Sequence, residues 1–216
     1  MISIRPYTAS DKDAVKEIAT STAFFGDPVN AFMDDGNLFW DAFFDYFFEY
    51  EAETCWVAET GGAVIGFLAG AANYANQMKI TRQVIAPQVV RGIFRGGYRI
   101  RHKTMAYVWL LLWQGMLKPI PQIDYAQYPA NLHINVLSQT RGQGAGKALL
   151  DAYRRQMESR GIQGIHLHTT SYNIAACHLY ERMGYRLLCA WPSLVWPKFL
   201  GRKIENRCYG IVLHPN

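Results

Sequence analysis

The spacing of apolar and polar residues predicts a chain that opens with a strand, a helix and a β-hairpin. Residues 2–7 alternate between apolar and polar side chains, and residues 10–19 place apolar side chains at helical spacing behind a helix-start signal. Residues 54–59 and 63–71 are rich in β-forming residues and flank the turn signal Thr60-Gly61-Gly62. These segments predict strand, helix and hairpin in that order.

Residues 37–50 predict an amphipathic helix with an unusually bulky face, because aromatic side chains recur there at helical spacing with acids between them. Two interpretations fit such a face. It packs into the core, or it forms an aromatic wall of a substrate pocket.

The second half of the chain repeats the change between strand and helix periodicity. The predicted elements are a strand at 132–136, a helix from about 148 to Gly161, a strand at 165–170, a helix at 173–183 closed by Gly184, and strands at 185–191 and 207–213. A Pro/Gly-containing connection separates the last two strands. We therefore expect an α/β fold.

Residues 76–126 do not follow this alternation and predict a helical insertion. Arg91, Arg95 and Arg99 recur every four residues and form one stripe if the segment is helical, acting as a lid or a partner surface but not as a nucleic-acid site. An apolar helix at about 106–117 follows, and Lys118-Pro119-Ile120-Pro121 ends it. Because this helix lacks a charged face, we expect it to be buried within the protein or between subunits rather than to lie on a membrane.

Composition narrows the class of protein. With 216 residues, 50% of them hydrophobic, the chain can bury a substantial core, and a single domain spanning residues 1–216 is expected. No apolar run reaches the ~20 residues that cross a bilayer, and no exported leader opens the chain. The four cysteines show no CxxC pairing, so we expect reduced thiols and a cytoplasmic protein.

Charge is distributed unevenly along the chain. Residues 1–75 carry 3 basic and 12 acidic residues, residues 76–125 carry 8 and 1, and residues 126–216 carry 11 and 4. This asymmetry suggests an anionic ligand for the later part of the chain and a cationic ligand near its start, although solvated surfaces explain it equally well.

Three glycines carry the first chemical signal. Gly142, Gly144 and Gly146 stand where a predicted strand turns into a helix, and there bare N–H groups and the helix dipole favour a phosphate. Their spacing matches neither the Rossmann fingerprint nor a P-loop.

Together with the motifs that follow, this loop resembles the GCN5-related N-acetyltransferase (GNAT) family. The resemblance runs from about residue 132 to 185 and rests on Arg141-x-x-Gly144-x-Gly146, then Asn173, Ala176, Leu179-Tyr180-Glu181 and Met183-Gly184-Tyr185. It implies a mixed, mostly antiparallel central sheet flanked by helices and opened at its middle for acetyl-CoA. The insertion at 76–126 then lies between strands 3 and 4.

The resemblance also assigns the acetyl-CoA site. The backbone of Ile134, Asn135 and Val136 would pair with the pantetheine arm, and the Val136 amide would polarise the thioester carbonyl. Asn173 would hydrogen-bond the cofactor from the edge of the opening. The residues expected to cradle the pyrophosphate are Arg141, Gly142, Gln143, Gly144, Ala145, Gly146 and Lys147.

Tyr180 matches the family position of the general acid. A phenol has an ordinary pKa of about 10, so it is protonated at neutral pH and can supply a proton to a departing thiolate. The alternative is that Tyr180 merely packs against Ala176 and Met183.

His168 is the candidate base for the attacking amine, followed by a water chain, Glu49 and Glu51. A three-His metal site with His133 and His166 lacks a carboxylate at matching spacing, so no metal is predicted. Cys177 is assigned a structural role.

The resemblance implies transfer of an acetyl group from acetyl-CoA to a primary amine of a small molecule or peptide by direct attack. The alternative is a non-catalytic acyl-CoA-binding or regulatory module of the same fold. The expected partners are the amine substrate and a second copy of the chain, with neither nucleic acid nor membrane.

Overall fold

The computed structural model describes residues 1–117 and 121–213, which contain one seven-stranded sheet of order β1-β2-β3-β4-β5-β7-β6. Its strands are β1 (Ser3–Pro6), β2 (Trp56–Thr60), β3 (Ala63–Ala71), β4 (Ala130–Val136), β5 (Gly164–Thr170), β6 (Arg186–Pro192) and β7 (Glu205–Val212). Every neighbouring pair is antiparallel except β4 and β5. The predicted mixed, mostly antiparallel sheet is confirmed.

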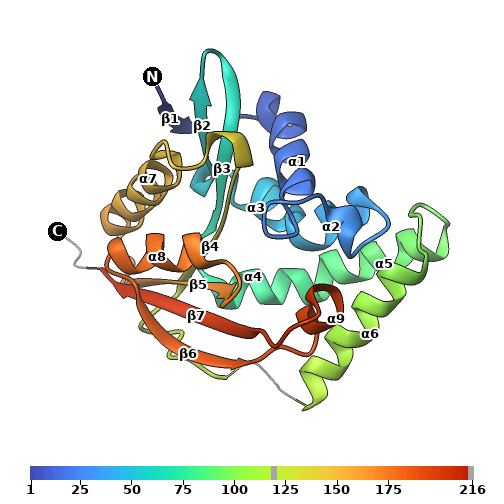
Figure 1. The fold of residues 1–216 in the computed structure, drawn as a ribbon. Coiled ribbons are helices and arrows are strands. Elements are labelled where there is room, and N and C mark those ends of the chain that lie inside the picture. Colours follow the sequence, from blue (N-terminus) through green and yellow to red (C-terminus); the bar gives the residue numbers. More distant parts are fainter. Residues whose placement is uncertain (118–120, 214–216) are drawn as a thin grey trace.

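Helices cover both faces of this sheet (Figure 1). They are α1 (Lys12–Ser21), α2 (Gly36–Phe43), α3 (Asp45–Tyr50), α4 (Tyr74–Ile80), α5 (Ala86–Phe94), α6 (His102–Leu117), α7 (Ala145–Ser159), α8 (Ile174–Arg182) and α9 (Trp196–Leu200). One core cluster packs the sheet against α7 and α8, and the other packs it against α1, α2 and α3. None of the helices formed by the described residues has the length and hydropathy of a membrane span.

The sheet divides at its middle because β4 and β5 pair only at their beginnings. Ala130 lies opposite Ile165 and Asn131 opposite His166, and no later pair joins the two strands along the described chain. Beyond these pairs β4 continues on β3 up to Val136, while β5 continues on β7. The two halves of the sheet therefore splay apart, and this opening positions the site.

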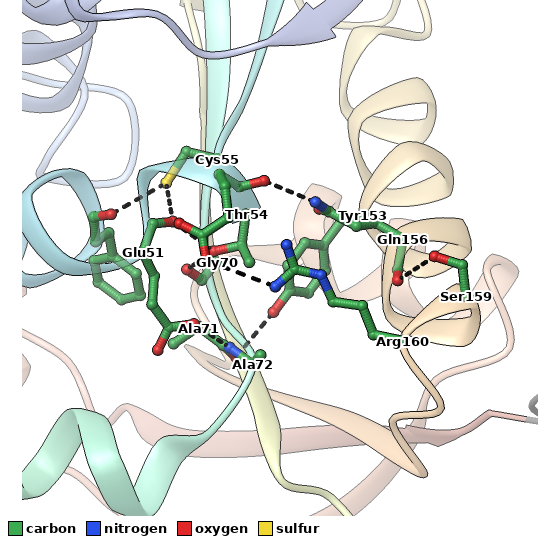
Figure 2. A network of polar contacts seen from close by, with 12 residues as sticks. Glu51, Thr54, Cys55, Gly70, Ala71, Ala72, Tyr153, Gln156, Ser159 and Arg160 are labelled. Atoms are coloured by element: carbon green, nitrogen blue, oxygen red, sulfur yellow. Dashed lines mark hydrogen bonds and ion pairs between the residues drawn. The ribbon is translucent and has the colours of Figure 1, made fainter.

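A polar network fixes the point where the strands separate (Figure 2). The Tyr153 hydroxyl of α7 lies 2.8 Å from the Asn131 carbonyl oxygen and 3.0 Å from that of Ala71. The Thr54 hydroxyl donates to the Gly70 carbonyl, 2.6 Å away. A Cβ atom at Gly70 would lie 2.1 Å from the Tyr153 ring, so only glycine lets the ring reach these carbonyls. The network thus ties β3 to β4 at Asn131, the β4 residue of the last β4–β5 pair.

The aromatic stretch at 37–50 forms two helices rather than the single predicted one. Phe44, with φ −120° and ψ −23°, leaves the helical conformation between α2 and α3. Phe47 and Phe48 are buried in the core, whereas Phe39 and Phe43 also reach a cavity. Both interpretations of the aromatic face therefore apply, each to part of it.

The insertion between β3 and β4 is helical, as predicted, and consists of α4, a π-helical turn at Thr81–Ile85, α5 and α6. The predicted arginine stripe is wrong. The helix α5 ends at Phe94 and Gly96 has φ +72°, so Arg95 is the C-cap and Arg99 lies in the following loop. The Asp35 carboxylate accepts hydrogen bonds both from the Arg99 N–H and from the start of α2, which ties the insertion to the body of the protein.

The helix α6 is not buried within the chain, which corrects one of its two expected locations, while burial between subunits stays a prediction. Only Thr104, Tyr107 and Gln114 of this helix are buried. Eight large apolar side chains are 39% to 77% exposed, namely Met105, Val108, Trp109, Leu111, Leu112, Trp113, Met116 and Leu117. Part of the predicted helix stop falls on residues 118–120, outside the described residues.

Candidate active site

The opening between β4 and β5 contains a cavity of about 1010 Å³. On one side it is lined by the loop before α7 and by α8, and on the other by α2, α6 and the segment around α9. Of the predicted site residues, all except Gln143 line it: Ile134, Asn135, Val136, Arg141, Gly142, Gly144, Ala145, Gly146, Lys147, His168, Asn173 and Tyr180. The fold therefore brings together residues from four separate segments.

The backbone of β4 presents to this opening polar groups that pair with no neighbouring strand of the described chain. The Leu137 N–H donates to the Ile65 carbonyl, so alternation along an antiparallel ladder directs the odd-numbered positions toward β3. Ile134 and Val136 consequently direct their N–H and C=O groups to the other side, where the Val136 carbonyl accepts from Arg141 Nε at 3.4 Å. Asn135 differs from its two neighbours, because its backbone N–H and C=O groups face β3. Its side-chain amide donates to Thr22 Oγ1 at 2.8 Å.

The glycine loop leaves its amides uncovered at the start of α7. Gly142 has φ +80° and Gly144 has φ +91°, a region that favours glycine, and a Cβ atom at either would contact nothing within 4 Å. Gly146 serves packing instead, because a Cβ atom there would lie 3.2 Å from Leu179 of α8. Lys147 forms an ion pair with Asp151 at 2.6 Å. The loop and the helix dipole together suit a phosphate group.

Tyr180 contacts the cavity from α8 and is otherwise buried between the rings of Tyr185 and Tyr209. Burial raises the pKa of its phenol above the ordinary value, because the phenolate would be poorly solvated. The hydroxyl is therefore protonated throughout the physiological range, as a proton donor must be.

Two imidazoles face the cavity from the opposite side of the sheet. The side chains of His168 on β5 and His133 on β4 are both accessible from the cavity. Desolvation lowers the pKa of His168 to about 4, and nearby His166 and His133 add to this effect. Desolvation likewise lowers the pKa of His133 to about 4. Both rings are neutral at pH 7 and can accept a proton.

The other polar candidates lie outside the cavity. His166 is buried and its Nδ1 lies 2.8 Å from the Tyr128 carbonyl oxygen. Cys177 is buried too, with its thiol 3.5 Å from the Thr170 carbonyl oxygen. Among the described residues no cluster of His, Cys, Asp or Glu side chains is arranged to hold a metal ion.

The two reserve bases are also remote from the cavity. Glu49 forms an ion pair with Lys12 at 2.7 Å, and the Glu51 carboxylate accepts from the Ala72 N–H and from the Tyr46 hydroxyl. Neither carboxylate contacts the cavity. His133, which the sequence singled out only as a metal candidate, is the second imidazole that lines the cavity.

Comparison with known proteins finds a family match for part of the chain. The sequence model of the GNAT acetyltransferase family matches residues 106–185. The solved structure of a protein named SsHAT shares 26% identity with this chain and superposes with a TM-score of 0.75, covering 98% of each chain. The segment at residues 106–185 therefore matches the GNAT acetyltransferase family, and the whole chain shares the fold of SsHAT.

Two further proteins resemble this chain, one in a short stretch of sequence and the other in its fold. Streptothricin acetyltransferase of Escherichia coli is 36% identical over 55 residues, which span 26% of this chain and 32% of that protein. YncA of Salmonella typhimurium, solved with its cofactor acetyl-CoA, is 14% identical with a TM-score of 0.61, covering 100% of this chain and 95% of that one. At that identity YncA shares the fold alone, and the match to the curated relative covers about a third of that protein.

The GNAT-matched segment contains the glycine loop, Asn173 and Tyr180, but not the aromatic residues 25–44 that face them across the cavity. Motif reasoning found the first set because its members stand close together in the sequence. For the aromatic face of residues 37–50 it left a core and a pocket wall open as alternatives, because aromatic residues at helical spacing are typical of both.

Proposed function

We propose that this protein is an acetyl-CoA-dependent N-acetyltransferase that moves an acetyl group to a primary amine by direct attack. One observation carries the proposal: a single cavity contacts the part of β4 that β5 leaves without a strand partner, the open glycine loop and the protonated Tyr180. Acetyl-CoA offers a pantetheine arm, a pyrophosphate and a thioester, and these three groups match the three features in kind.

The residues divide the work of binding. The N–H and C=O groups of Ile134 and Val136 hold the pantetheine arm as an added strand. The amides of the loop from Gly142 to Gly146 bind the pyrophosphate, and the Arg141 guanidinium adds charge-assisted hydrogen bonds. Asn173 contacts the arm at the edge of the opening.

Two side chains move the protons. Acetyl-CoA supplies the acetyl group as a thioester, whose C–S bond breaks as the C–N bond to the amine forms. Tyr180 donates its hydroxyl proton to the departing sulfur, and solvent restores it. His168 accepts the proton that the attacking nitrogen releases, either directly or through one water molecule. The Val136 N–H donates to the carbonyl oxygen as negative charge develops on it.

Thiol release tests this proposal against the non-catalytic acyl-CoA-binding module. We expect acetyl-CoA to bind in calorimetry and free CoA thiol to appear when an amine panel is added. Binding without thiol release for any amine would favour the regulatory module.

The remaining assignments belong to the same proposal. Residues 1–216 form one acetyltransferase domain, which acts in the cytoplasm on a small-molecule or peptide amine, without nucleic acid or membrane as a partner. We also propose a homodimer formed through the exposed face of α6. That face carries no charged residue from Thr104 to Leu117, whereas helices that lie on membranes carry a charged face.

A further inference from the structure

The half of the cavity opposite the glycine loop is built from aromatic rings. Its wall includes Phe32, Phe39, Phe43, Phe44, Tyr107 and Trp196. These rings support one another: the Phe32 centroid lies 4.8 Å from that of Tyr107, 5.5 Å from that of Trp196 and 6.0 Å from that of Phe39. Interlocked rings of this kind form a rigid apolar wall that binds flat apolar groups.

Charge is absent from this half. No Asp or Glu side chain is among the described residues that line the cavity, and its cationic residues are Arg141, Lys147 and Arg182, on the loop and helices of the cofactor side. A second ammonium or a guanidinium on the acceptor would find no carboxylate here. A carboxylate on the acceptor would find no cation beyond those of the cofactor side.

The acidic residues near the start of the chain are engaged elsewhere. Asp34 accepts hydrogen bonds from the N–H groups of Arg101 and Thr104, and Asp35 caps α2. Asp11 is paired with Arg5 at 2.7 Å. These contacts are structural, so the expectation that the acidic segment recruits a cationic amine finds no support in the cavity lining.

The polar groups of the acceptor half are uncharged. His168 and His133 are neutral imidazoles, and the ring centroid of His168 lies 5.9 Å from that of Trp191. Gln114 of α6 reaches the cavity while its amide contacts the Pro192 carbonyl and the Leu194 N–H. Such groups can position one amine and a neutral substituent, but they offer no ion pair.

We propose that the acetyl acceptor is a primary monoamine with a flat aromatic or similarly apolar body and no second charge. This inference rests on the proposed acetyl transfer and narrows its substrate class. A second charge on the acceptor would be desolvated without a partner, which lowers kcat/KM by at least about ten-fold, whereas the aromatic body gains contact with the ring wall.

Matched amine pairs test the proposal on the native protein by thiol release. Phenylalanine adds a carboxylate to 2-phenylethylamine, and 1,6-diaminohexane adds an ammonium to hexylamine. We expect kcat/KM to be at least about ten-fold higher for the singly charged member of each pair and highest for 2-phenylethylamine. Equal or greater kcat/KM for the diamine, for agmatine or for phenylalanine would overturn the substrate class and leave acetyl transfer standing. Thiol release with none of the amines would overturn acetyl transfer itself.

Two adjacent leucines of α6 provide a matched pair of variants. Leu111 is 39% exposed and lines the cavity, while Leu112 is 59% exposed and does not line it. Leu111→Glu places a carboxylate beside the acceptor, so we expect the ratio of kcat/KM for 2-phenylethylamine to that for agmatine to fall at least about ten-fold. In Leu112→Glu the ratio should stay that of the native protein. The same ratio in both variants would contradict the placement of the acceptor against α6.

Discussion

Removing the Tyr180 hydroxyl tests whether this residue acts as the general acid or only packs in the core. Tyr180→Phe keeps the buried ring but removes the proton that the thiolate needs. General acids contribute about 10²–10⁴ in rate, so we expect kcat to fall at least about 10²-fold with little change in the Kd of acetyl-CoA. Stopped thiol-release assays and calorimetry measure the two quantities separately.

Tyr185→Phe is the matched control for Tyr180→Phe. The two phenols are buried neighbours with ring centroids 6.0 Å apart, and Tyr185 does not line the cavity. It should keep native kcat. Full activity of Tyr180→Phe on its best amine would mean that solvent or another group protonates the sulfur.

His168 sets a prediction about pH. With the ordinary histidine pKa of about 6.5, kcat/KM would decline as the pH falls through about 6.5. Desolvation, however, lowers the pKa of His168 to about 4. The imidazole is neutral above that pH and protonated below it, so activity that depends on the free base is lost only as the pH falls through about 4. We therefore expect kcat/KM to show no His168-dependent decline between pH 6.5 and 5.

His168→Ala should lower kcat by about 10²-fold or more and remove this low-pH limb. His178 is an exposed histidine on α8 that does not line the cavity, so His178→Ala serves as the control. It should keep the native kcat and the native low-pH limb. A low-pH limb that survives in His168→Ala would transfer the role of base to His133, the other cavity-facing imidazole.

Among the structural elements, the turn into α7 is the part of the site that we propose binds the charged pyrophosphate. Gly144→Glu places a carboxylate where we propose that the pyrophosphate binds, so we expect CoA affinity to fall more than about 100-fold in calorimetry. Any side chain also strains the positive φ at this position, at a cost of about 1–3 kcal/mol in the free energy of unfolding.

Gly161→Glu separates these two effects. Gly161 follows the other end of α7, has φ +71°, and its added Cβ atom would contact nothing within 4 Å. It should suffer a similar loss of stability and retain native CoA affinity. Equal CoA affinity in both folded variants would disprove the loop assignment.

The sequence predicts those elements that depend on local periodicity, and the hairpin at Gly61-Gly62 and the helix α7 are examples. The broken aromatic helix at Phe44 and the short helix α9 were not predicted, because tertiary packing decides them. The error at Arg91, Arg95 and Arg99 had a visible cause: Gly96-Gly97 is a helix-stop signal that the four-residue spacing obscured.

The site divides in the same way. The loop and Tyr180 are readable because family motifs carry them. The direction of the Asn135 backbone and the aromatic wall depend on how β4, α2, α6 and α9 meet in space. The spacing of residues along the sequence does not predict how elements that are distant in the chain pack against one another.

At the scale of the whole molecule, α6 has two distinct faces. Thr104, Tyr107 and Gln114 face inward, where Tyr107 and Gln114 contact the cavity and Thr104 binds Asp34. The outward side is apolar along the helix, and exposed apolar patches of this kind are typical of protein interfaces. An insertion that lines the active site therefore also carries the surface proposed to join two copies, so the two roles can be tested on separate faces of one helix.

Trp109→Glu tests the assembly, because Trp109 is 60% exposed on the outward face. The native chain should sediment at twice the mass of one chain at micromolar concentration, since pairing removes the apolar faces from water. Trp109→Glu should sediment as a monomer, because burying an unpaired carboxylate in that interface is costly. Leu187→Glu, at an exposed position of β6, should remain dimeric. Sedimentation with anionic liposomes tests the alternative that this face binds a membrane. A native protein that is a monomer in solution but pellets with the vesicles would contradict the dimer and favour membrane binding.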